Sequence, residues 1–537
     1  MRRHRPEIIF ALLLLLTPAL VWVYWDVRLS WEIRAEWNRI REEGYPTSLD
    51  DLTPGPIPDA QNAAIGYMRA MRQITLMDVA AYEAGASSPK FEAIRAGEDY
   101  REMPTAANEQ CLREALDSET VRNALREAIE ASRTPACVFP CAGKPDWDVG
   151  DEQHFGLIDV FGQLLGVRGR LYETDGDRAE ALECYLALLR MSRHALSHAP
   201  LGTQATGYRL HSEALAGLAH MTRTGSLSPG QAAEAAEHLD AIDPYASLHE
   251  SLCKVRAAYI ADTFLSPGGL RKWCRYTSFR RRAVVLRGLP CVGDVCVCRE
   301  RTCRLDETPY HSWIGVPWRR YDQRESLVLA RTLIDISERP PRVSWHASRA
   351  LMNEWKWGKH DVAAPATAKF AYCVGGLFYE QQQAIVKTEL CRAVLAAQAF
   401  YRIHGVYPNS LAELSQCPGI AVPTDPFTEG SFGYKRLRSG CIIYSFGPDG
   451  IDDGGLPYTG SEYDLDKAGY DIPWWCDTGG SASSDLPSDR SGPPTHTTEQ
   501  VNAHAPPTEM GNPAASAPVA HTRAGVGLPR CAPVMGD

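Results

Sequence analysis

Residues 155–191, FGLIDVFGQLLGVRGRLYETDGDRAEALECYLALLRM, decide the fold class expected for most of this chain. Their first half places apolar side chains on one helical face, at Leu157, Phe161, Leu164 and Leu171. After a break at Asp175-Gly176-Asp177, a second apolar face consists of Ala181, Tyr185, Leu188 and Met191. Two helices joined by so short a break pack as antiparallel neighbours, so the stretch predicts a helical hairpin.

The surrounding region, residues 61–380, has mainly helical patterning. A capping-box start at Ser228-Pro229-Gly230-Gln231 opens a further helix that runs to Ile242. The string GDxxEAxxxY, from Gly176 to Tyr185, resembles the helix start of tetratricopeptide repeats, but no period of about 34 residues accompanies it. The sequence therefore predicts a helical bundle or irregular α-solenoid, and by analogy of fold a surface that binds a protein partner.

The composition is that of an ordinary folded protein. Hydrophobic residues make up 44% and charged residues 23% of 537 residues, a length that suggests roughly three units. The formal net charge of −10 is too small for this length to indicate a nucleic acid partner. No P-loop, G-x-G-x-x-G after a strand or G-x-S-x-G elbow is present, so the enzyme question stays open and leans towards no.

The N-terminal region predicts a membrane anchor. Residues 8–25, IIFALLLLLTPALVWVYW, are uncharged and nearly all apolar, enough to cross about 27 Å of hydrocarbon as a helix. Arginines precede the run, and Trp22, Tyr24 and Trp25 close it at the expected depth of an interfacial aromatic belt. Because no A-x-A-like cleavage site follows, an uncleaved anchor is favoured over a signal peptide.

Two features set the expected topology. Arginines on both sides of the span weaken the positive-inside contrast, whereas all sixteen cysteines follow the span, which fits an oxidising compartment. We expect a cytoplasmic stretch 1–7, a single span 8–25, a juxtamembrane helix and proline-rich strap 26–60, and the bulk of the chain outside the cytoplasm. Residues 44–64 resemble a segment of uncharacterised membrane-anchored bacterial envelope proteins, which implies no activity.

A basic, cysteine-rich insertion occupies residues 271–304. It contains ten Lys or Arg residues and only two acidic residues, with aromatic residues interleaved. This composition is typical of a solvated surface, and alternatively of a site that binds an anionic surface or an acidic partner. Its cysteines have the spacing C-x4-C-x-C-x4-C, at Cys291, Cys296, Cys298 and Cys303. The absence of a C-x2-C pair or a nearby histidine favours disulfides, with a metal site or free thiols as alternatives.

Two histidines one turn apart, His194 and His198, lie on the second helix of the hairpin. Such a pair can grip a metal, but no H-E-x-x-H pattern is present, and surface or capping histidines are the favoured interpretation. A metal-dependent envelope enzyme is one alternative function. A thiol- or disulfide-handling role for Cys137, Cys141 and the 291–303 cluster is the other.

The C-terminal region changes from helical to strand patterning. A helix with Leu390, Val394, Ala397 and Tyr401 on its apolar face ends at His404-Gly405. Strands are predicted at 432–435 and 441–446, joined by a turn at 438–440. The next loop, Gly447–Gly455, carries Asp449, Asp452 and Asp453, and such crowded like charge needs solvent or a hard cation to neutralise it.

This order of features resembles the globular part of type II secretion major pseudopilins. The shared pieces are G-x-YP-x-SL at 405–411, DPF at 425–427, Y-S-x-G-x-DG at 444–450 and a final Asp-Ile at 471–472, all within residues 385–476. The resemblance implies a small α+β module with structural calcium. Asp449 and Asp471 match family ligands, whereas Gly469 replaces another, for which Asp464 or Asp466 can substitute. The candidate calcium ligands are Asp449, Asp452, Asp453, Asp464, Asp466 and Asp471.

The chain departs from the pseudopilins at its N-terminus, which lacks their processing glycine, so no pilin-like filament is expected. Residues 477–537 hold nine prolines and no aromatic residue, a composition that predicts disorder. The sequence thus predicts a mainly α chain with an N-terminal transmembrane helix and a small C-terminal α+β module. Its expected role is binding or scaffolding through the helical domain, with calcium as a stabilising ion.

Overall fold

A computed structural model describes residues 5–48, 55, 57–83, 105–139, 147–198, 201–224, 227–265, 316–355, 365–416, 423–437, 440–456 and 471–477. The described residues all belong to one compact unit, 1–485. The basic insertion with Cys291, Cys296, Cys298 and Cys303, and the tail after residue 477, lie outside the described residues.

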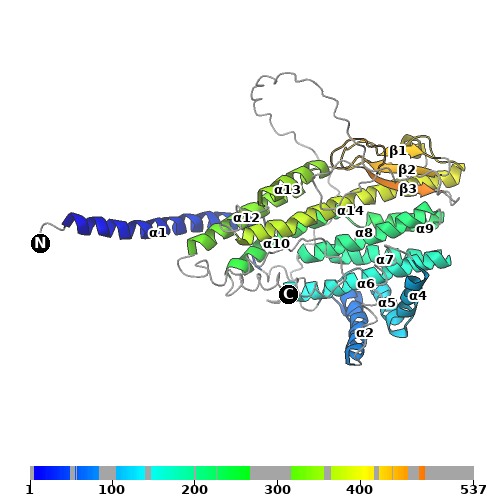
Figure 1. Cartoon of the computed structure of the whole chain (residues 1–537), viewed down its shortest axis with the longest axis horizontal. Coiled ribbons are helices and arrows are strands. Elements are labelled where there is room, and N and C mark those ends of the chain that lie inside the picture. Colours follow the sequence, from blue (N-terminus) through cyan, green and yellow to red (C-terminus); the bar gives the residue numbers. More distant parts are fainter. Residues whose placement is uncertain are drawn as a thin grey trace, which may run out of the picture. The chain divides into compact units, whose positions relative to one another are not determined.

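The described fold is mainly helical with one small antiparallel sheet, as predicted (Figure 1). The α-helices are α1 Arg5–Glu42, α2 Ala63–Glu83, α4 Ala106–Leu116, α5 Glu119–Ser132, α6 Trp147–Asp175, α7 Arg178–Leu196, α8 Leu201–Arg223, α9 Pro229–Asp240, α10 Pro244–Leu265, α12 Val316–Ser337, α13 Pro341–Trp355 and α14 Pro365–His404. Short 3-10 helices are η2 Asp59–Gln61 and η5 Leu411–Gln416. The strands are β1 Gly433–Arg436, β2 Gly440–Ser445 and β3 Ile472–Asp477.

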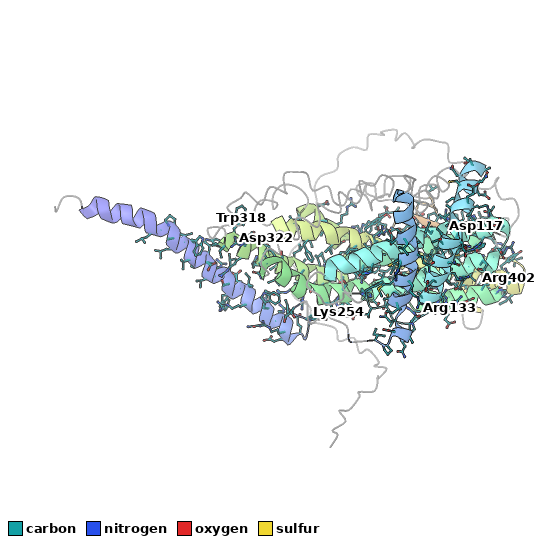
Figure 2. All side chains as sticks on the ribbon, turned by 90° about the horizontal axis from the view of Figure 1, so that it is seen from below. Asp117, Arg133, Lys254, Trp318, Asp322 and Arg402 are labelled. Carbon is teal, nitrogen blue, oxygen red and sulfur yellow. The ribbon has the colours of Figure 1, made fainter. Side chains whose placement is uncertain are left out.

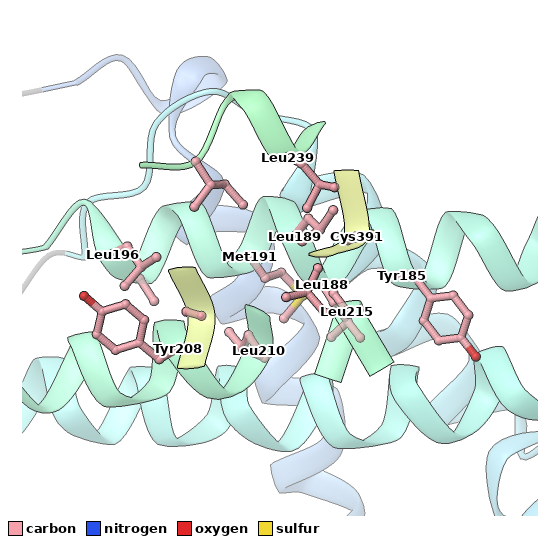
Figure 3. Packing of buried hydrophobic residues seen from close by; sticks show 14 of the residues in the cluster. Tyr185, Leu188, Leu189, Met191, Leu196, Tyr208, Leu210, Leu215, Leu239 and Cys391 are labelled. Atoms are coloured by element: carbon pink, nitrogen blue, oxygen red, sulfur yellow. The ribbon is translucent and has the colours of Figure 1, made fainter. Parts of the chain in front are cut away.

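The predicted hairpin forms the centre of the core as α6 and α7. Gly176 makes the turn with a φ of 82°, a left-handed value that glycine adopts without strain. Helix α7 is buried along most of its length between α6, α8 and α9. Figure 3 shows apolar side chains of α7, α8 and α9 meeting Cys391 of α14 in this core. The predicted capping box is confirmed as well, because Ser228 Oγ accepts from the Gln231 N–H and Gln231 Oε1 accepts from the Ser228 N–H.

Glycines allow α6 and α8 to approach the ring of Tyr185 on α7. A Cβ atom on Gly169 would lie 2.7 Å from that ring, and one on Gly217 would lie 2.2 Å from it. The ring is held in place because Tyr185 Oη donates to Glu173 Oε1 at 2.5 Å. Neither neighbour can therefore carry a larger side chain without displacing a buried aromatic ring.

Helix α14 connects the helical layers to the sheet. It packs against α8, α10, α12 and α13, and also contacts β2 and β3, so the sheet lies beside it (Figure 1). Asp322 of α12 receives the Thr367 N–H at 2.9 Å and so satisfies a backbone donor in the first turn of α14. Trp474 of β3 donates its indole N–H to Thr222 Oγ1 of α8 at 3.1 Å. The C-terminal strands are thereby packed on the helical body.

The sheet has the order β1-β2-β3 with antiparallel neighbours. Tyr434 lies opposite Ile443, and Ile443 lies opposite Trp474. The first two strands were predicted to within one residue, and the helix end at His404-Gly405 is confirmed, with Gly405 at a φ of 73°. Strand β3 has no counterpart in the sequence prediction.

Helix α1 runs without a break from Arg5 to Glu42, with Pro18 inside it. It therefore joins the expected span and the expected juxtamembrane helix in one element. No helix in the described part of the chain is both long enough and apolar enough to cross a membrane. The side chains of residues 5–15, which belong largely to the expected span, lie outside the described residues.

The second half of α1 packs against α12 (Figure 2). An apolar face of this half is buried, at Leu29, Ile33, Trp37 and Ile40. Acidic residues of α1 meet arginines of α12 along the same seam, in the pairs Asp26–Arg320, Glu32–Arg324 and Glu36–Arg331. Because the residue numbers increase in the same order on both helices from one pair to the next, the two helices run parallel.

Substitution of Gly217 by alanine should destabilise the fold, whereas the same change at Gly156 should not. The Cβ atom of Gly217→Ala meets the Tyr185 ring, for which we expect a loss of about 1–2 kcal/mol after the gain in helix propensity. Gly156 is exposed on α6 with nothing within 4 Å, so Gly156→Ala should gain up to about 1 kcal/mol. Urea unfolding of both variants measures the difference, and equal effects would contradict the close packing of Tyr185.

Candidate metal site in the aspartate-rich loop

The loop between β2 and β3 brings several of the predicted calcium ligands close together. Four of its glycines have φ values between 66° and 78°, at Gly447, Gly450, Gly454 and Gly455. Only glycine adopts these values readily, so the tight path of the loop follows from its composition. Ser445 pairs with Ile472, and this register places Asp471 at the base of the loop. The Gly455 N–H donates to Asp471 Oδ2 at 2.6 Å.

Hydrogen bonds orient two further carboxylates of the loop. Asp449 Oδ1 accepts from the Ile451 N–H at 3.1 Å. Asp452 Oδ1 accepts from Tyr444 Oη at 3.0 Å and from the Gly454 N–H at 2.8 Å. Both side chains therefore stabilise local turns, and each retains a second oxygen with capacity to bind a cation.

Two buried carboxylate oxygens of the loop have no hydrogen-bond partner among the described residues. They are Asp453 Oδ2 and Asp471 Oδ1, and Asp471 as a whole is 1% exposed. Burial raises the pKa of Asp471 to about 6, against hydrogen bonds from the backbone of Gly455 and Asp453 that lower it. Burial also raises the pKa of Asp453, and the charges of Asp449 and Asp452 raise it further. The loop therefore holds negative charge that its surroundings stabilise poorly.

Basic side chains near the loop bind its carbonyl groups and not its carboxylates. Lys435 Nζ donates to the Gly454 carbonyl oxygen at 2.5 Å, and Arg342 Nη2 donates to that of Asp449 at 2.8 Å. His346 Nε2 lies 3.1 Å from the Pro448 carbonyl oxygen. Of the loop carboxylates that the structure describes, Asp449, Asp452, Asp453 and Asp471, none forms an ion pair with a described Lys, Arg or His side chain. A hard cation would supply the missing positive charge.

The described carboxylates do not form a complete metal site by themselves. No group of three or more His, Cys, Asp or Glu side chains among the described residues is arranged to hold a metal ion. Asp464 and Asp466 lie outside the described residues. Asp453 Oδ2 and Asp471 Oδ1 are the oxygens best suited to a cation, because both are buried and lack a partner within this part of the chain.

Asp425, by contrast, is a buried carboxylate whose two oxygens both accept hydrogen bonds. Its Oδ1 accepts from the Phe427 N–H at 3.0 Å and from Ser445 Oγ at 2.8 Å, and its Oδ2 accepts from the Phe446 N–H at 3.0 Å. The sequence identified Asp425-Pro426-Phe427 only as a turn. The structure adds that this carboxylate fastens the turn to the end of β2, directly before the loop.

His194 and His198 were expected to be surface or capping residues, and of these two roles the surface one is wrong. They are 1% and 8% exposed, and their Nε2 atoms lie 2.8 Å and 2.6 Å from the carbonyl oxygens of Thr134 and Cys137. His194 Nδ1 lies 2.9 Å from Tyr67 Oη, and burial lowers the pKa of His194 to about 4. The pair therefore cross-links α7 to the segment after α5, as capping groups do, and does not form a metal grip.

The described cysteines include one in contact with a histidine. Cys253 Sγ lies 3.6 Å from His249 Nε2, and His249 Nδ1 lies 2.9 Å from Ser337 Oγ. Ser337 donates its own proton to the Ile334 carbonyl, so it accepts from His249 Nδ1 and leaves Nε2 facing the thiol. Cys253 is 2% exposed and burial raises its pKa, which disfavours the reactive thiolate. Cys141 lies outside the described residues.

Comparison with known proteins gives no relative. The chain matches no protein-family model, no curated protein and no solved structure. The roles considered for its residues therefore depend on the chemistry of the chain itself.

The raised pKa of Asp471 predicts a distinct pH dependence of stability. The folded chain binds the proton of Asp471 more tightly than the unfolded chain does. The protonated carboxyl therefore makes its full contribution to the free energy of unfolding below about pH 4, and this contribution is lost as the pH rises through about 6. In a chelating buffer, the wild-type free energy of unfolding should therefore fall relative to that of Asp471→Asn by up to about 3 kcal/mol over this range. Urea titrations across the range test it, and parallel curves for the two proteins would contradict it.

Proposed function

We propose that the chain is a single-pass membrane protein whose helical body, outside the cytoplasm, binds or scaffolds a protein partner. The observation that carries the proposal is the change in exposure along α1. Before Asp26 the helix exposes large apolar side chains, with Leu16 52% and Leu20 66% exposed. After Asp26 one face of the helix is buried, with Leu29 and Ile40 each 3% exposed, whereas Val27 and Trp31 off that face remain 59% and 69% exposed. One helix thus has an unpartnered apolar half and a packed amphipathic half.

The unpartnered half is better suited to lipid than to water. Beyond Leu16 and Leu20, its exposed side chains are Val21, Val23, Tyr24 and Trp25. Contiguous apolar exposure of this kind is unfavourable in water and typical of a surface that contacts lipid or a partner. The aromatic residues come last, followed by Arg28, whose guanidinium lies 5.9 Å from the Trp25 ring centroid. This order suits the boundary between hydrocarbon and headgroups.

The ion pairs between α1 and α12 support a fixed placement of the body relative to this anchor. Arg320 pairs with the Asp26 carboxylate at 2.9 Å and also donates to the Asp26 carbonyl oxygen at 2.9 Å. Helix α12 therefore begins beside the end of the apolar run and extends in the same direction as α1. No flexible linker separates the proposed span from the first packed turn, because α1 is continuous there.

We further propose that the C-terminal module is pseudopilin-like and stabilised by calcium. The long helix α14, the turn at Gly405, the 3-10 helix η5 and the antiparallel sheet follow one another in the order that the resemblance implies. The unpartnered oxygens of Asp453 and Asp471 supply hard ligands in the loop that the resemblance identifies. In this proposal the ion has a structural role and the helical body provides the binding surface.

Arginines in the exposed half of α1 should release the protein from membranes. Each arginine at the centre of a spanning helix costs about 2.5–3.5 kcal/mol of insertion free energy. Because Leu16 and Leu20 are exposed, Leu16→Arg with Leu20→Arg should leave the folded body intact. Carbonate extraction of membranes is the measurement, with Leu16→Ile and Leu20→Ile as the matched control. Release of the arginine variant alone is expected, whereas extraction of wild-type protein would contradict the anchor.

Calcium should raise the thermal unfolding transition of the full chain in detergent. A site with a dissociation constant of about 10 µM gains about 2.7 kcal/mol at a hundredfold excess, a shift of a few degrees. The double variant Asp453→Asn and Asp471→Asn should lose the shift, whereas Asp117→Asn, an exposed carboxylate on another part of the surface, should keep it. A wild-type transition that is unchanged between calcium and chelator would contradict the calcium proposal and leave the anchor unaffected.

A further inference from the structure

The strand register places two cysteines at directly opposite positions on neighbouring strands. In the antiparallel pair of β2 and β3, Cys441 is the direct partner of Cys476. Directly opposite residues in such a pair have Cα atoms about 4.5–5.5 Å apart, within the range of about 4.4–6.8 Å that a disulfide spans. Residues in direct register also occupy the same face of a sheet. The register therefore places the Cα atoms of these two residues at a separation that a disulfide can span.

The pair lies on the face of the sheet that packs against the helices. Ile443 and Trp474 form the register pair two residues along, so both pairs occupy one face. Trp474 contacts Thr222 of α8 from that face, and Cys441 is 0% exposed. A disulfide here would be shielded from reductants once the sheet has packed on the helices.

We propose that Cys441 and Cys476 form a disulfide that closes the base of the aspartate-rich loop. All six candidate calcium ligands, from Asp449 to Asp471, lie between these two cysteines in sequence. The bond would tie the two ends of this segment together in the unfolded chain, which lowers its conformational entropy, and it would hold the register that places Asp471 beside Gly455. The formation of this bond in the cell rests on the proposed location outside the cytoplasm. The strand register that would allow the bond is independent of that location.

The chemistry needs a disulfide oxidant, in the cell a thiol-oxidising protein and in the test oxidised glutathione. One cysteine thiolate attacks the glutathione disulfide and releases one glutathione thiolate, which leaves a mixed disulfide. The second cysteine thiolate then attacks the protein sulfur of the mixed disulfide and releases the other glutathione. Two protein thiols are oxidised to one disulfide, and two protons and two electrons pass to the two glutathiones. Since Cys441 is buried in the folded chain, oxidation should be fast during folding and slow afterwards.

Peptide mapping under non-reducing conditions tests the pairing directly. Trypsin cleaves after Arg438, Lys467 and Arg490, so Cys441 and Cys476 fall in the peptides 439–467 and 468–490, each with a single cysteine. Full-length protein is extracted from membranes, unfolded with iodoacetamide present and digested. We expect the two peptides as one linked species that separates on reduction. Recovery of both peptides alkylated and separate would overturn the proposal for the protein in its own compartment.

A refolding arm separates this proposal from the proposed location. Reduced full-length protein is refolded in detergent with oxidised and reduced glutathione and mapped in the same way. If cell-derived protein is reduced but the refolded protein carries the 441–476 link, the location fails and the structural inference stands. If the refolded protein links these cysteines to others or to none, the structural inference fails wherever the protein resides.

A matched pair of variants measures what the bond contributes. Cys476→Ser should lower the thermal transition of oxidised protein by several degrees and leave that of reduced protein nearly unchanged, because only the oxidised wild type has the link. Cys391→Ser, at a buried cysteine of α14, should change the transition equally under both conditions. An equal effect of Cys476→Ser with and without reductant would contradict the proposed bond.

Discussion

The packing of the second half of α1 against α12 is the constraint on which the rest of the described structure depends. One face of α1 is buried at Leu29, Ile33, Trp37 and Ile40, and acidic residues of α1 face arginines of α12 along the seam. Because α1 is a single helix, its exposed apolar half and its packed half cannot reorient independently. Helix α12 in turn holds the start of α14 through Asp322, and α14 carries the sheet. The proposed membrane contact is thereby connected through packed helices to the loop that bears the candidate cation ligands.

Local sequence signals were enough to predict the elements whose formation depends on neighbours within about one helical turn. The α6–α7 hairpin follows from the apolar spacing around Gly176, the start of α9 from Ser228 and Gln231, and the end of α14 from Gly405. The crowding of Asp449, Asp452 and Asp453 was visible in the same way. Their pattern also led to the expectation of calcium, because calcium binds hard oxygen ligands such as carboxylates.

Features that depend on distant parts of the chain could not be read from local pattern. His194 looks like a surface residue in sequence, yet its ring nitrogens lie beside Tyr67 and Thr134, far away along the chain. Asp425 and Asp471 are both buried, but one accepts three hydrogen bonds and the other keeps an unpartnered oxygen. That difference arises from where β2 and β3 meet, and β3 itself exists only through its pairing with β2. The need for glycine at position 217 likewise becomes clear only when Tyr185 is known to pack against it.

The central claim is that one uninterrupted helix passes from a bilayer into the folded body, and hydrogen–deuterium exchange of the full chain in lipid nanodiscs tests it most directly. The account predicts slow exchange of backbone amides throughout residues 8–42, with protection by lipid before Asp26 and by α12 after it. Rapid exchange across residues 8–25, or a rapidly exchanging break near Asp26 between two protected segments, would contradict it.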